Sequence, residues 1–350
     1  MTVRFSTQTL SLLGTGSALP GPAVGNDELV AAIQSHCGDA HASVARKLLN
    51  RLGINHRHLS RDLATPRSGT LPGREAPELC RLALTDAAVS QSASFLIGHT
   101  STPHTLLPPN IAWVAEDMKF AGPYLEIRQA CTGFASALTT AAGLIADNPG
   151  EQVGIVGSET GSPFFEFSDE FIDREQLVNC VQMGDGAGAA LVAADDGSGR
   201  QRISDIYTGH IGIDKQPGIS LESGGSADPR GDKSVPYFKH RAGDVRKSGE
   251  ALLLEGIRAM QDRGYSLQDF DWVIPHQVNG HIAALFAARI PELDGKVFVI
   301  ADETGNLGSA AIWVGLDQLR RSGRLQRGQK VLILGAEASK YMVGGFVYTH

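Results

Sequence analysis

An internal repeat is the sequence feature that most constrains the fold. The segment 152–160, Gln-Val-Gly-Ile-Val-Gly-Ser-Glu-Thr, resembles the segment 330–338, Lys-Val-Leu-Ile-Leu-Gly-Ala-Glu-Ala. Each segment follows a strand, a turn and a helix made of small residues, and each leads to a Gly-rich final strand. Similarity of this kind indicates repeated structural units. We therefore predict two similar α/β halves stacked on each other, with chance similarity of two buried strands as the alternative.

The clearest hinge between these halves is the segment 195–200, Asp-Asp-Gly-Ser-Gly-Arg. Such residues favour turns and loops. We therefore predict an N-terminal half over residues 1–196 and a C-terminal half over residues 197–350. The pattern further predicts a first strand over 9–13, which ends at Gly14, and a strand over 296–300 in the second half.

Composition excludes several classes of protein. The 350 residues carry a net charge of −7 with acids and bases scattered along the chain, which argues against nucleic acid and anionic membrane surfaces as partners. Cys37, Cys80, Cys131 and Cys180 form no CxxC pair, which argues against a zinc site and a disulfide framework and favours a reducing cytoplasm. We expect no signal peptide and no membrane span, because no window approaches the ~18 apolar residues that a span needs.

Cys131 is the first candidate for chemistry. Leu125 and Ile127 alternate with polar residues as in a short strand, and residues 132–146 are small and apolar as in a tightly packed helix. Cys131 is therefore predicted at a strand-to-helix corner, near the first turn of the helix. The unpaired N–H groups there favour an anion, so we expect a lowered thiol pKa. A small buried core cysteine is the alternative.

Two further polar residues follow predicted strands in the second half. His276 comes directly after 272–275, and Asn306 follows the strand predicted over 296–300. In open α/β sheets, ligands collect beyond the carboxyl ends of the strands. Cys131, His276 and Asn306 would supply a nucleophile, an imidazole and an amide donor at such a place. Taken singly, the histidine and the asparagine are more typical of structural and turn residues.

Seven short motifs keep one order along nearly the whole chain: 13–20 (Leu-Gly-Thr-Gly-Ser-Ala-Leu-Pro), 51–54 (Arg-Leu-Gly-Ile), 100–103 (Thr-Ser-Thr-Pro), 130–134 (Ala-Cys-Thr-Gly-Phe), 184–190 (Gly-Asp-Gly-Ala-Gly-Ala-Ala), 275–279 (Pro-His-Gln-Val-Asn) and 305–311 (Gly-Asn-Leu-Gly-Ser-Ala-Ala). In this order they resemble the β-ketoacyl-ACP synthase III family of the thiolase superfamily. The resemblance implies a five-layered αβαβα fold built from two duplicated halves, and a homodimer.

The resemblance also implies a reaction. Cys131 would accept an acyl group from an acyl-CoA or acyl carrier protein thioester. His276 and Asn306 would hydrogen-bond the carbonyl of a malonyl thioester and stabilise the enolate formed when carbon dioxide leaves. The enolate would attack the acyl group, with the Cys131 N–H as one oxyanion donor. This chemistry needs no cofactor beyond the thioester substrates and no metal.

The chain departs from the family at two places. Residues 335–345 lack the family's glycine run, so Ser339 is an approximate candidate for the second oxyanion donor, and Lys340 and Tyr341 are expected to narrow the pocket. At the carrier-facing mouth, Lys47 replaces the family's tryptophan and His281 an arginine. These departures indicate a specialised or secondary-metabolite homologue, such as one from a polyketide pathway, rather than a housekeeping enzyme of fatty-acid biosynthesis.

Weaker assignments also follow from the resemblance. Arg51 and Asn279 are retained as substrate-binding residues, and Leu107 lies near the position where the family gates the acyl pocket across the dimer. Glu159 and Glu337, as lone acids, are expected to be solvated or structural rather than general bases. Two other functions stay open. One is acyl transfer to a hydroxyl or amine without carbon–carbon bond formation, and the other is a non-catalytic subunit of a heterodimeric synthase.

Overall fold

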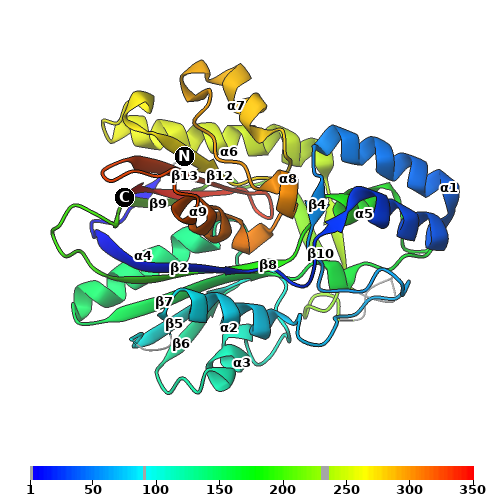
Figure 1. The fold of residues 1–350 in the computed structure, drawn as a ribbon, viewed down its shortest axis with the longest axis horizontal. Coiled ribbons are helices and arrows are strands. Elements are labelled where there is room, and N and C mark those ends of the chain that lie inside the picture. The colour runs from blue at the N-terminus through cyan, green and yellow to red at the C-terminus, as the bar shows by residue number, and fades with distance from the viewer. Residues whose placement is uncertain (1–2, 90–91, 230–235) are drawn as a thin grey trace.

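A large mixed β-sheet runs through the computed structural model, which describes residues 3–89, 92–229 and 236–350 (Figure 1). Its strands lie in the order β12-β13-β14-β9-β2-β8-β7-β5-β6, and β1 pairs with β9. The strands of this sheet are β1 (Arg4–Phe5), β2 (Leu10–Ala18), β5 (Phe95–His99), β6 (Tyr124–Ile127), β7 (Gln152–Glu159), β8 (Gly186–Ala194), β9 (Arg202–His210), β12 (Trp272–Pro275), β13 (Lys330–Glu337) and β14 (Met342–Thr349). Two small antiparallel pairs join β3 (Val24–Gly25) to β4 (His56–Arg57) and β10 (Ile219–Glu222) to β11 (Tyr237–His240).

The sheet consists of two similar halves. In the first, β5 runs parallel to β7, and β7, β8 and β2 follow as antiparallel neighbours. In the second, β12 runs parallel to β13, and β13, β14 and β9 follow in the same way. The two segments of the internal repeat become β7 and β13, which occupy equivalent places. The predicted duplication is therefore confirmed by the topology, while the division at residue 196 stays a prediction.

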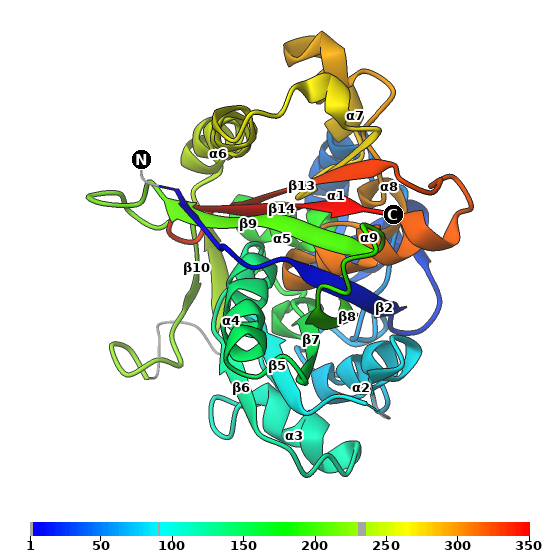
Figure 2. The same cartoon turned by 90° about the vertical axis from the view of Figure 1, so that its left-hand side faces the viewer.

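The halves stack face to face around a central layer of helices (Figure 2). Helix α4 contacts strands of both halves, including β7 and β9, and α9 contacts β2, β8 and β12. On the outer faces, α2 covers β2, β7 and β8, and α6 covers β13 and β14. The helices are α1 (Asn26–Leu52), α2 (Ala76–Asp86), α3 (Asn110–Asp117), α4 (Gly133–Asp147), α5 (Arg174–Gln182), α6 (Ala242–Asp262), α7 (Ile282–Arg289), α8 (Ala301–Thr304) and α9 (Ala311–Arg321). The predicted five-layered αβαβα arrangement is confirmed.

Small residues allow the central layer to pack closely. Ala135, Ala137, Ala141 and Ala142 of α4 are all buried, so the helix approaches both sheets without large side chains between them. Phe134 at its start packs edge-on against Trp313 of α9, with ring centroids 6.2 Å apart. This contact fixes the beginnings of the two central helices relative to each other.

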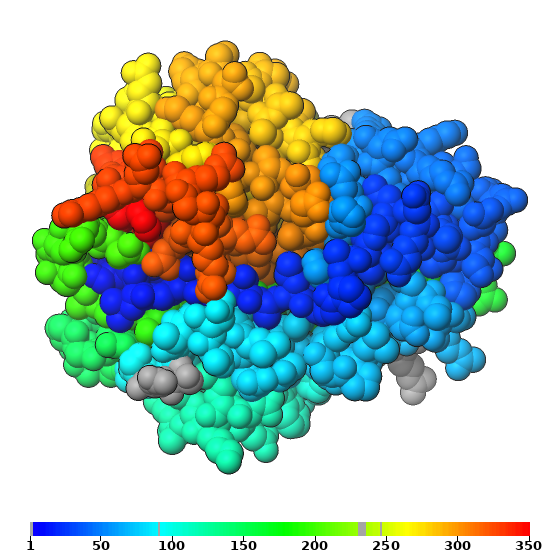
Figure 3. Space-filling model, in the orientation of Figure 1, coloured from blue at the N-terminus to red at the C-terminus, as the bar shows by residue number. Residues whose placement is uncertain are grey.

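The two halves share one short edge. Leu10 and Ser11 of β2 pair with Ile203 and Arg202 of β9 on one side, and β2 pairs with β8 along its length on the other. Figure 3 shows the N-terminal segment, in dark blue, running across one face of the molecule between the orange and cyan segments. The start of the chain therefore connects the two halves of the sheet.

One predicted strand boundary is wrong. The first strand does not end at Gly14 but continues to Ala18, because Gly14 and Gly16 lie against the backbone of α2. A β-carbon on either glycine would come 2.3 Å from a carbonyl oxygen of that helix region, so these glycines serve close packing rather than a turn.

The strand predicted over 296–300 is reduced to a single bridge between Val297 and Val273. The side chain of Gln277 replaces the missing ladder: its Nε2 donates to the Phe298 carbonyl, and its Oε1 accepts from the Ile300 and Ala301 N–H groups. This buried amide therefore satisfies the backbone of 298–301 where a neighbouring strand was expected.

Among the described residues, no helix is both long and apolar enough to cross a lipid bilayer.

Candidate active site

Cys131 lies in the connection between β6 and α4. Gly133 is the first residue of the helix, and Thr132 precedes it with φ −113° and ψ 2°. The predicted strand-to-helix corner is therefore confirmed. Cys131 is half-buried and forms no disulfide.

His276 directly follows β12 and is buried. The backbone N–H of His276 donates to the Leu334 carbonyl of β13 at 2.7 Å, which extends the pairing of the two strands by one residue. Burial lowers the pKa of His276 to about 4, so the imidazole is neutral at pH 7. Its Nδ1 has no hydrogen-bond partner among the described residues. A neutral imidazole can donate one N–H to a substrate oxygen without carrying a charge.

Asn306 follows Gly305, whose φ of +69° turns the chain out of α8. The Asn306 backbone is fixed on both sides, because its N–H donates to the Gln182 carbonyl and its carbonyl accepts from the Gly184 N–H. The side-chain Oδ1 accepts from the Gly308 N–H at 3.0 Å. The side-chain NH₂ group is thereby oriented as the end that can donate to a ligand.

Several contacts bring these three residues to one edge of the central layer. The Ser309 hydroxyl, three residues after Asn306, donates to the Gln129 carbonyl at 3.4 Å, two residues before Cys131. His276 lies beside Leu334, and the neighbouring Gly335 packs against Phe134 at the start of α4. Cys131 and His276 thus follow the parallel strands β6 and β12, whereas Asn306 follows the short helix α8 and not the strand expected before it. Their catalytic roles stay predictions.

Glu159 is one of two buried carboxylates at this edge. It ends β7, and its Oε1 accepts hydrogen bonds from the hydroxyls of Ser101 (2.7 Å) and Thr102 (2.6 Å). Its Oε2 accepts from the N–H and hydroxyl of Ser309, at 3.0 and 2.9 Å. This carboxylate connects the end of β7 to the segment that carries Asn306.

Glu337 is the second buried carboxylate, and it ends β13. Its Oε2 accepts from the Thr132 N–H at 3.1 Å and from the Thr132 hydroxyl at 2.7 Å, and its Oε1 accepts from the Ser339 hydroxyl. Glu337 thus caps the start of α4, one residue after Cys131. Both glutamates are structural hydrogen-bond acceptors rather than solvated acids. The sequence signal for them was the repeat itself, because each is the eighth residue of its repeated segment.

The expected lowering of the Cys131 pKa is wrong. Burial raises the pKa of the thiol well above its ordinary value, and the negative charges of Glu337 and Glu159 raise it further. The start of the helix does favour an anion, but the Glu337 carboxylate already occupies the Thr132 N–H.

The expectation that Lys340 and Tyr341 narrow the pocket is also wrong. Lys340 is exposed, and its Nζ donates to the Gly212 and Lys215 carbonyls. Tyr341 has a φ of +58° and is buried among residues that pack under α6. Ser339 directs its hydroxyl to Glu337 instead. The two large side chains of the turn between β13 and β14 therefore contact the segment around residues 212–215 and the core under α6. The oxyanion role of Ser339 stays a prediction.

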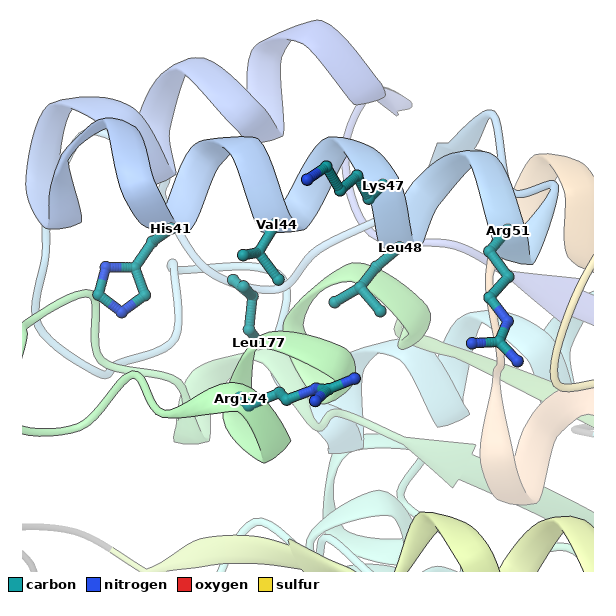
Figure 4. Close-up of a pocket in the computed structure, with 7 residues that line it drawn as sticks. All are labelled: His41, Val44, Lys47, Leu48, Arg51, Arg174 and Leu177. Atoms are coloured by element: carbon teal, nitrogen blue, oxygen red, sulfur yellow. The ribbon is translucent and has the colours of Figure 1, made fainter.

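A cationic groove lies between α1 and α5 (Figure 4). It has a volume of about 470 Å³, with Lys47, Arg51 and Arg174 among its lining residues. The apolar part of the lining comes from Val44, Leu48 and Leu177. Arg174 was not identified from the sequence; it is the first residue of α5 and directly follows the N-cap Asp173. Anionic ligands suit such a combination of guanidinium groups and apolar surface.

The other predicted residues occupy separate places. The Asn279 side chain accepts from the His281 N–H at 2.9 Å and so orders the turn before α7. The His281 ring lies against Gly53 at the end of α1, two residues from Arg51. Leu107 is 85% exposed on the segment before α3.

Comparison with known proteins places this geometry in a family. The model of the 3-oxoacyl-[acyl-carrier-protein] synthase III family matches residues 125–210, and the model of its C-terminal domain matches 260–347. A β-ketoacyl-[acyl-carrier-protein] synthase III from Bordetella petrii is 29% identical over 344 residues, which cover 96% of this chain and 95% of the relative.

Two solved structures show the same fold. The tetronic acid condensing enzyme AbyA1 aligns with a TM-score of 0.82 and 26% identity, over 97% of this chain and all of that one. The 3-oxoacyl-(acyl carrier protein) synthase III of Pseudomonas aeruginosa aligns with a TM-score of 0.78 and 23% identity, over 98% of each chain.

The stacked halves and the central helix layer define a thiolase-like fold, with the cysteine at the start of α4. The two family models and the synthase III relatives, which match 96% of the chain, support a place for it in the β-ketoacyl-ACP synthase III family of acyltransferases. The resemblance inferred from the seven motifs is confirmed.

Proposed function

We propose that this protein condenses an acyl group with a malonyl thioester and releases carbon dioxide. The proposal is supported by the contacts that link the segments carrying Cys131, His276 and Asn306. Ser309 lies against the Gln129 carbonyl, and His276 is hydrogen-bonded to β13, which packs on the start of α4. Together, Cys131, His276 and Asn306 supply an acyl acceptor and two neutral hydrogen-bond donors. No cofactor or metal is required in this proposal, and CoA or carrier-protein thioesters are substrates.

The first half-reaction is an exchange of thioesters. The Cys131 sulfur attacks the acyl carbonyl, the bond from that carbonyl to the carrier sulfur breaks, and the carrier leaves as a thiol with the proton that Cys131 gave up. Acyl-Cys131 is then neutral. Backbone N–H groups of Cys131 and Ser339 are our candidates for stabilising the oxyanion during this exchange.

The second half-reaction forms the carbon–carbon bond. The malonyl carboxylate leaves as carbon dioxide, and its electron pair becomes an enolate on the thioester oxygen. The His276 N–H and the Asn306 NH₂ group donate to that oxygen, and preorganised donors of this kind contribute roughly 3 kcal/mol each. The enolate carbon attacks acyl-Cys131, the sulfur leaves and takes up a proton, and a β-ketoacyl thioester is released.

The groove between α1 and α5 is our candidate for the carrier side of the substrate. Its three cations suit the phosphates of CoA or of the carrier's phosphopantetheine, and its apolar lining suits the groups between them. Lys47 and His281 alter this mouth relative to the family pattern. We therefore favour a specialised pathway, such as polyketide or other secondary metabolism, over primary fatty-acid biosynthesis.

We further propose that the protein works as a homodimer in a reducing cytoplasm. Leu106 and Leu107 are 65% and 85% exposed on the same loop, and their burial by a second copy would remove this apolar surface from water. The four free cysteines suit a reducing compartment.

Intact mass spectrometry after incubation with a panel of acyl-CoAs tests the proposal. The wild-type chain should gain one acyl mass, and Cys131→Ala should gain none. His276→Ala and Asn306→Ala should retain acyl loading and lose carbon dioxide release from malonyl-CoA or a malonyl carrier.

Two results would point elsewhere. An ester or amide product would indicate acyl transfer to a hydroxyl or amine instead of condensation. Absence of any acyl adduct with every donor would indicate a non-catalytic subunit of a heterodimeric synthase.

A further inference from the structure

Gln129 lies two residues before Cys131, and none of the reaction steps above uses its side chain. The residue is half-buried, and its backbone carbonyl accepts from the Ser309 hydroxyl at 3.4 Å. Its side-chain Nε2 donates to the Sδ of Met342 at 2.9 Å. Its side-chain Oε1 is buried and has no hydrogen-bond partner in the described part of the chain. Gln129 therefore brings a free acceptor into the surroundings of the acyl-accepting thiol.

The sulfur of Met342 sets the orientation of this amide. A thioether has lone pairs and no hydrogen, so it can accept from the NH₂ group but cannot donate to the carbonyl oxygen. The reversed amide would place two acceptors against each other and leave the NH₂ group without its partner. The oxygen is therefore the end of the Gln129 side chain that stays free.

The hairpin of β13 and β14 holds the segment around Cys131 at two points. Glu337 and Met342 are cross-strand partners beside the turn of this hairpin. Glu337 accepts from Thr132, one residue after Cys131, and Met342 accepts from Gln129, two residues before it. Both flanks of the nucleophile are thus bound to one cross-strand pair, which fixes the Gln129 side chain relative to the thiol.

A buried acceptor without a donor costs free energy, because it has lost its contact with water and gained no hydrogen bond in return. Most buried side-chain oxygens in proteins are paired. An unpaired one beside a nucleophile suits a ligand that supplies the missing donor. An unsubstituted alkyl chain offers no donor, whereas a hydroxyl group on the chain does.

The contacts of Gln129 favour the acyl group over the carrier arm as this ligand. Residues of α1 and α5 line the candidate carrier groove. Gln129 is bound instead to β14 and to Ser309. After loading, the acyl carbonyl is bonded to the Cys131 sulfur, so the first carbons of the acyl chain lie close to the segment that carries Gln129.

We propose that Gln129 is a specificity-determining residue that selects acyl groups with a hydroxyl on the second or third carbon. The hydroxyl donates to Oε1 when the acyl group is bound, and an unsubstituted acyl group leaves that oxygen unpaired. A site that hydrogen-bonds a substrate group discriminates against the analogue that lacks the group. This inference rests on the proposed acyl loading of Cys131 and names the class of acyl group for it, and it changes no step of the reaction.

The first test compares matched donors. Acyl loading from propionyl-CoA and 2-hydroxypropionyl-CoA, and from butyryl-CoA and 3-hydroxybutyryl-CoA, is followed by intact mass in wild type and Gln129→Met. Methionine keeps the length of the side chain and removes Oε1. We expect wild type to load the hydroxylated member of at least one pair about tenfold faster, and Q129M to lose most of that preference. Because both members of a pair carry the same CoA, the ratio of their rates reports on the acyl group alone.

Gln152→Met is the matched control. Gln152 is also half-buried, and its Oε1 also lacks a partner among the described residues, but it begins β7, at the opposite end of the strand from Glu159. Q152M should keep the preference of wild type. Met342→Leu removes the sulfur that orients the Gln129 amide and should reduce the preference by a smaller factor than Q129M does.

Two results would overturn the proposal. One is equal loading within both pairs in wild type. The other is a Q129M variant that slows both members of a pair by the same factor, which would assign the oxygen to the carrier arm or to the fold. A thermal midpoint of Q129M below that of wild type would point to the fold, since removal of an unpaired acceptor should not destabilise the resting protein.

Failure of the proposed function gives a different result, because no acyl mass would then appear with any donor. Calorimetric titration of Cys131→Ala with the same four CoA thioesters decides the role of Gln129 in that case. Tighter binding of a hydroxylated member that disappears on addition of Gln129→Met would support the proposal. Equal binding within both pairs would refute it.

Discussion

Glu159 and Glu337 end the equivalent strands β7 and β13 of the two halves. Each carboxylate accepts hydrogen bonds from a residue near the start of a central helix in the opposite half, α9 for Glu159 and α4 for Glu337. Glu159 of the first half accepts from the Ser309 N–H and hydroxyl, and Glu337 of the second half accepts from the Thr132 N–H and hydroxyl. The residue before the capped one differs: it is Gly308 on one side and Cys131 on the other. One duplicated contact therefore holds the segment that carries Asn306 on one side and the segment that carries Cys131 on the other.

The remaining partners also differ between the halves. The first half places the hydroxyls of Ser101 and Thr102 after β5, where they bind Glu159, and the second half places His276 after β12. Hydroxyls do not titrate, whereas an imidazole does. The first half thus uses this position to hold a carboxylate, and the second half places a buried, neutral imidazole there. Four measurements separate these roles.

Removal of the better-bound carboxylate should have the largest effect. Glu159→Ala leaves the donors of Ser101, Thr102 and Ser309 buried without an acceptor, and we expect a loss of about 4 kcal/mol in the free energy of unfolding. Glu337→Ala leaves fewer donors and should cost about 3 kcal/mol. Urea unfolding measures both, with the exposed Glu116→Ala as control within about 0.5 kcal/mol. A larger loss for E337A would reverse the ranking of the two caps.

Acidification should affect the second half through His276. The pKa of His276 is lowered to about 4, so the folded state binds fewer protons than the unfolded state. Its contribution to stability is present above pH 6.5 and is lost as the pH falls towards 4, by roughly 3 kcal/mol at most.

Urea unfolding at pH 7 and pH 4 checks the histidine. His276→Asn should lose less stability between these pH values than wild type does, with His99 titrating equally in both proteins. An identical pH dependence in the two proteins would mean that another group carries the acid sensitivity.

Adding a methyl group at Gly308 should impair condensation and leave acyl loading intact. Gly308 has a φ of +49°, and a β-carbon there would come 2.4 Å from Glu159 Oε2. Gly308→Ala should therefore cost about 2 kcal/mol through strain and displacement of the carboxylate. The Asn306 side chain accepts a hydrogen bond from the Gly308 N–H, so a shift of Gly308 should displace Asn306. Condensation should therefore fall at least tenfold while acyl loading persists. A matched loss of loading, measured by intact mass, would contradict this separation.

The smallest effects should come from the capping hydroxyls. Thr132→Val and Ser309→Ala each remove one hydroxyl that donates to a buried carboxylate and leave the backbone N–H contact in place. Each should cost about 1.5 kcal/mol in the free energy of unfolding. The exposed Thr85→Ala, which removes a hydroxyl bound only to a helix carbonyl, is the control. Costs that differ by more than about 1 kcal/mol between the two variants would mean that the caps are not equivalent.

The sequence allowed the fold and the three central residues to be predicted because their signals are local. The repeat marked β7 and β13, and short motifs around Cys131, His276 and Asn306 carried the family resemblance. The environment of Cys131 could not be predicted, since Glu337 and Thr132 are 205 residues apart. The first strand was cut short at Gly14 because a glycine that packs against a helix and a glycine in a turn look alike in sequence.

The remaining misses have similar causes. Lys340 and Tyr341 were expected in the pocket because the sequence gives their size but not the direction set by a φ of +58° at Tyr341. Arg174 could not be identified from the sequence, because it lines the groove together with residues of α1, which is distant in sequence and adjacent in space. The backbone of residues 298–301 is hydrogen-bonded by the side chain of Gln277 and not by a neighbouring strand. Such an arrangement leaves no periodic pattern in the sequence.

The paired edges of the sheet have a consequence for how the protein is made on the ribosome. Arg4 and Phe5 find their partners only when Tyr207 and Thr208 have been synthesised, and Thr132 receives its cap only when Glu337 emerges near the end of translation. Until then the cysteine belongs to an incomplete fold, and its reactivity is that of an ordinary nascent-chain thiol. The last strands to fold would therefore complete the environment of Cys131.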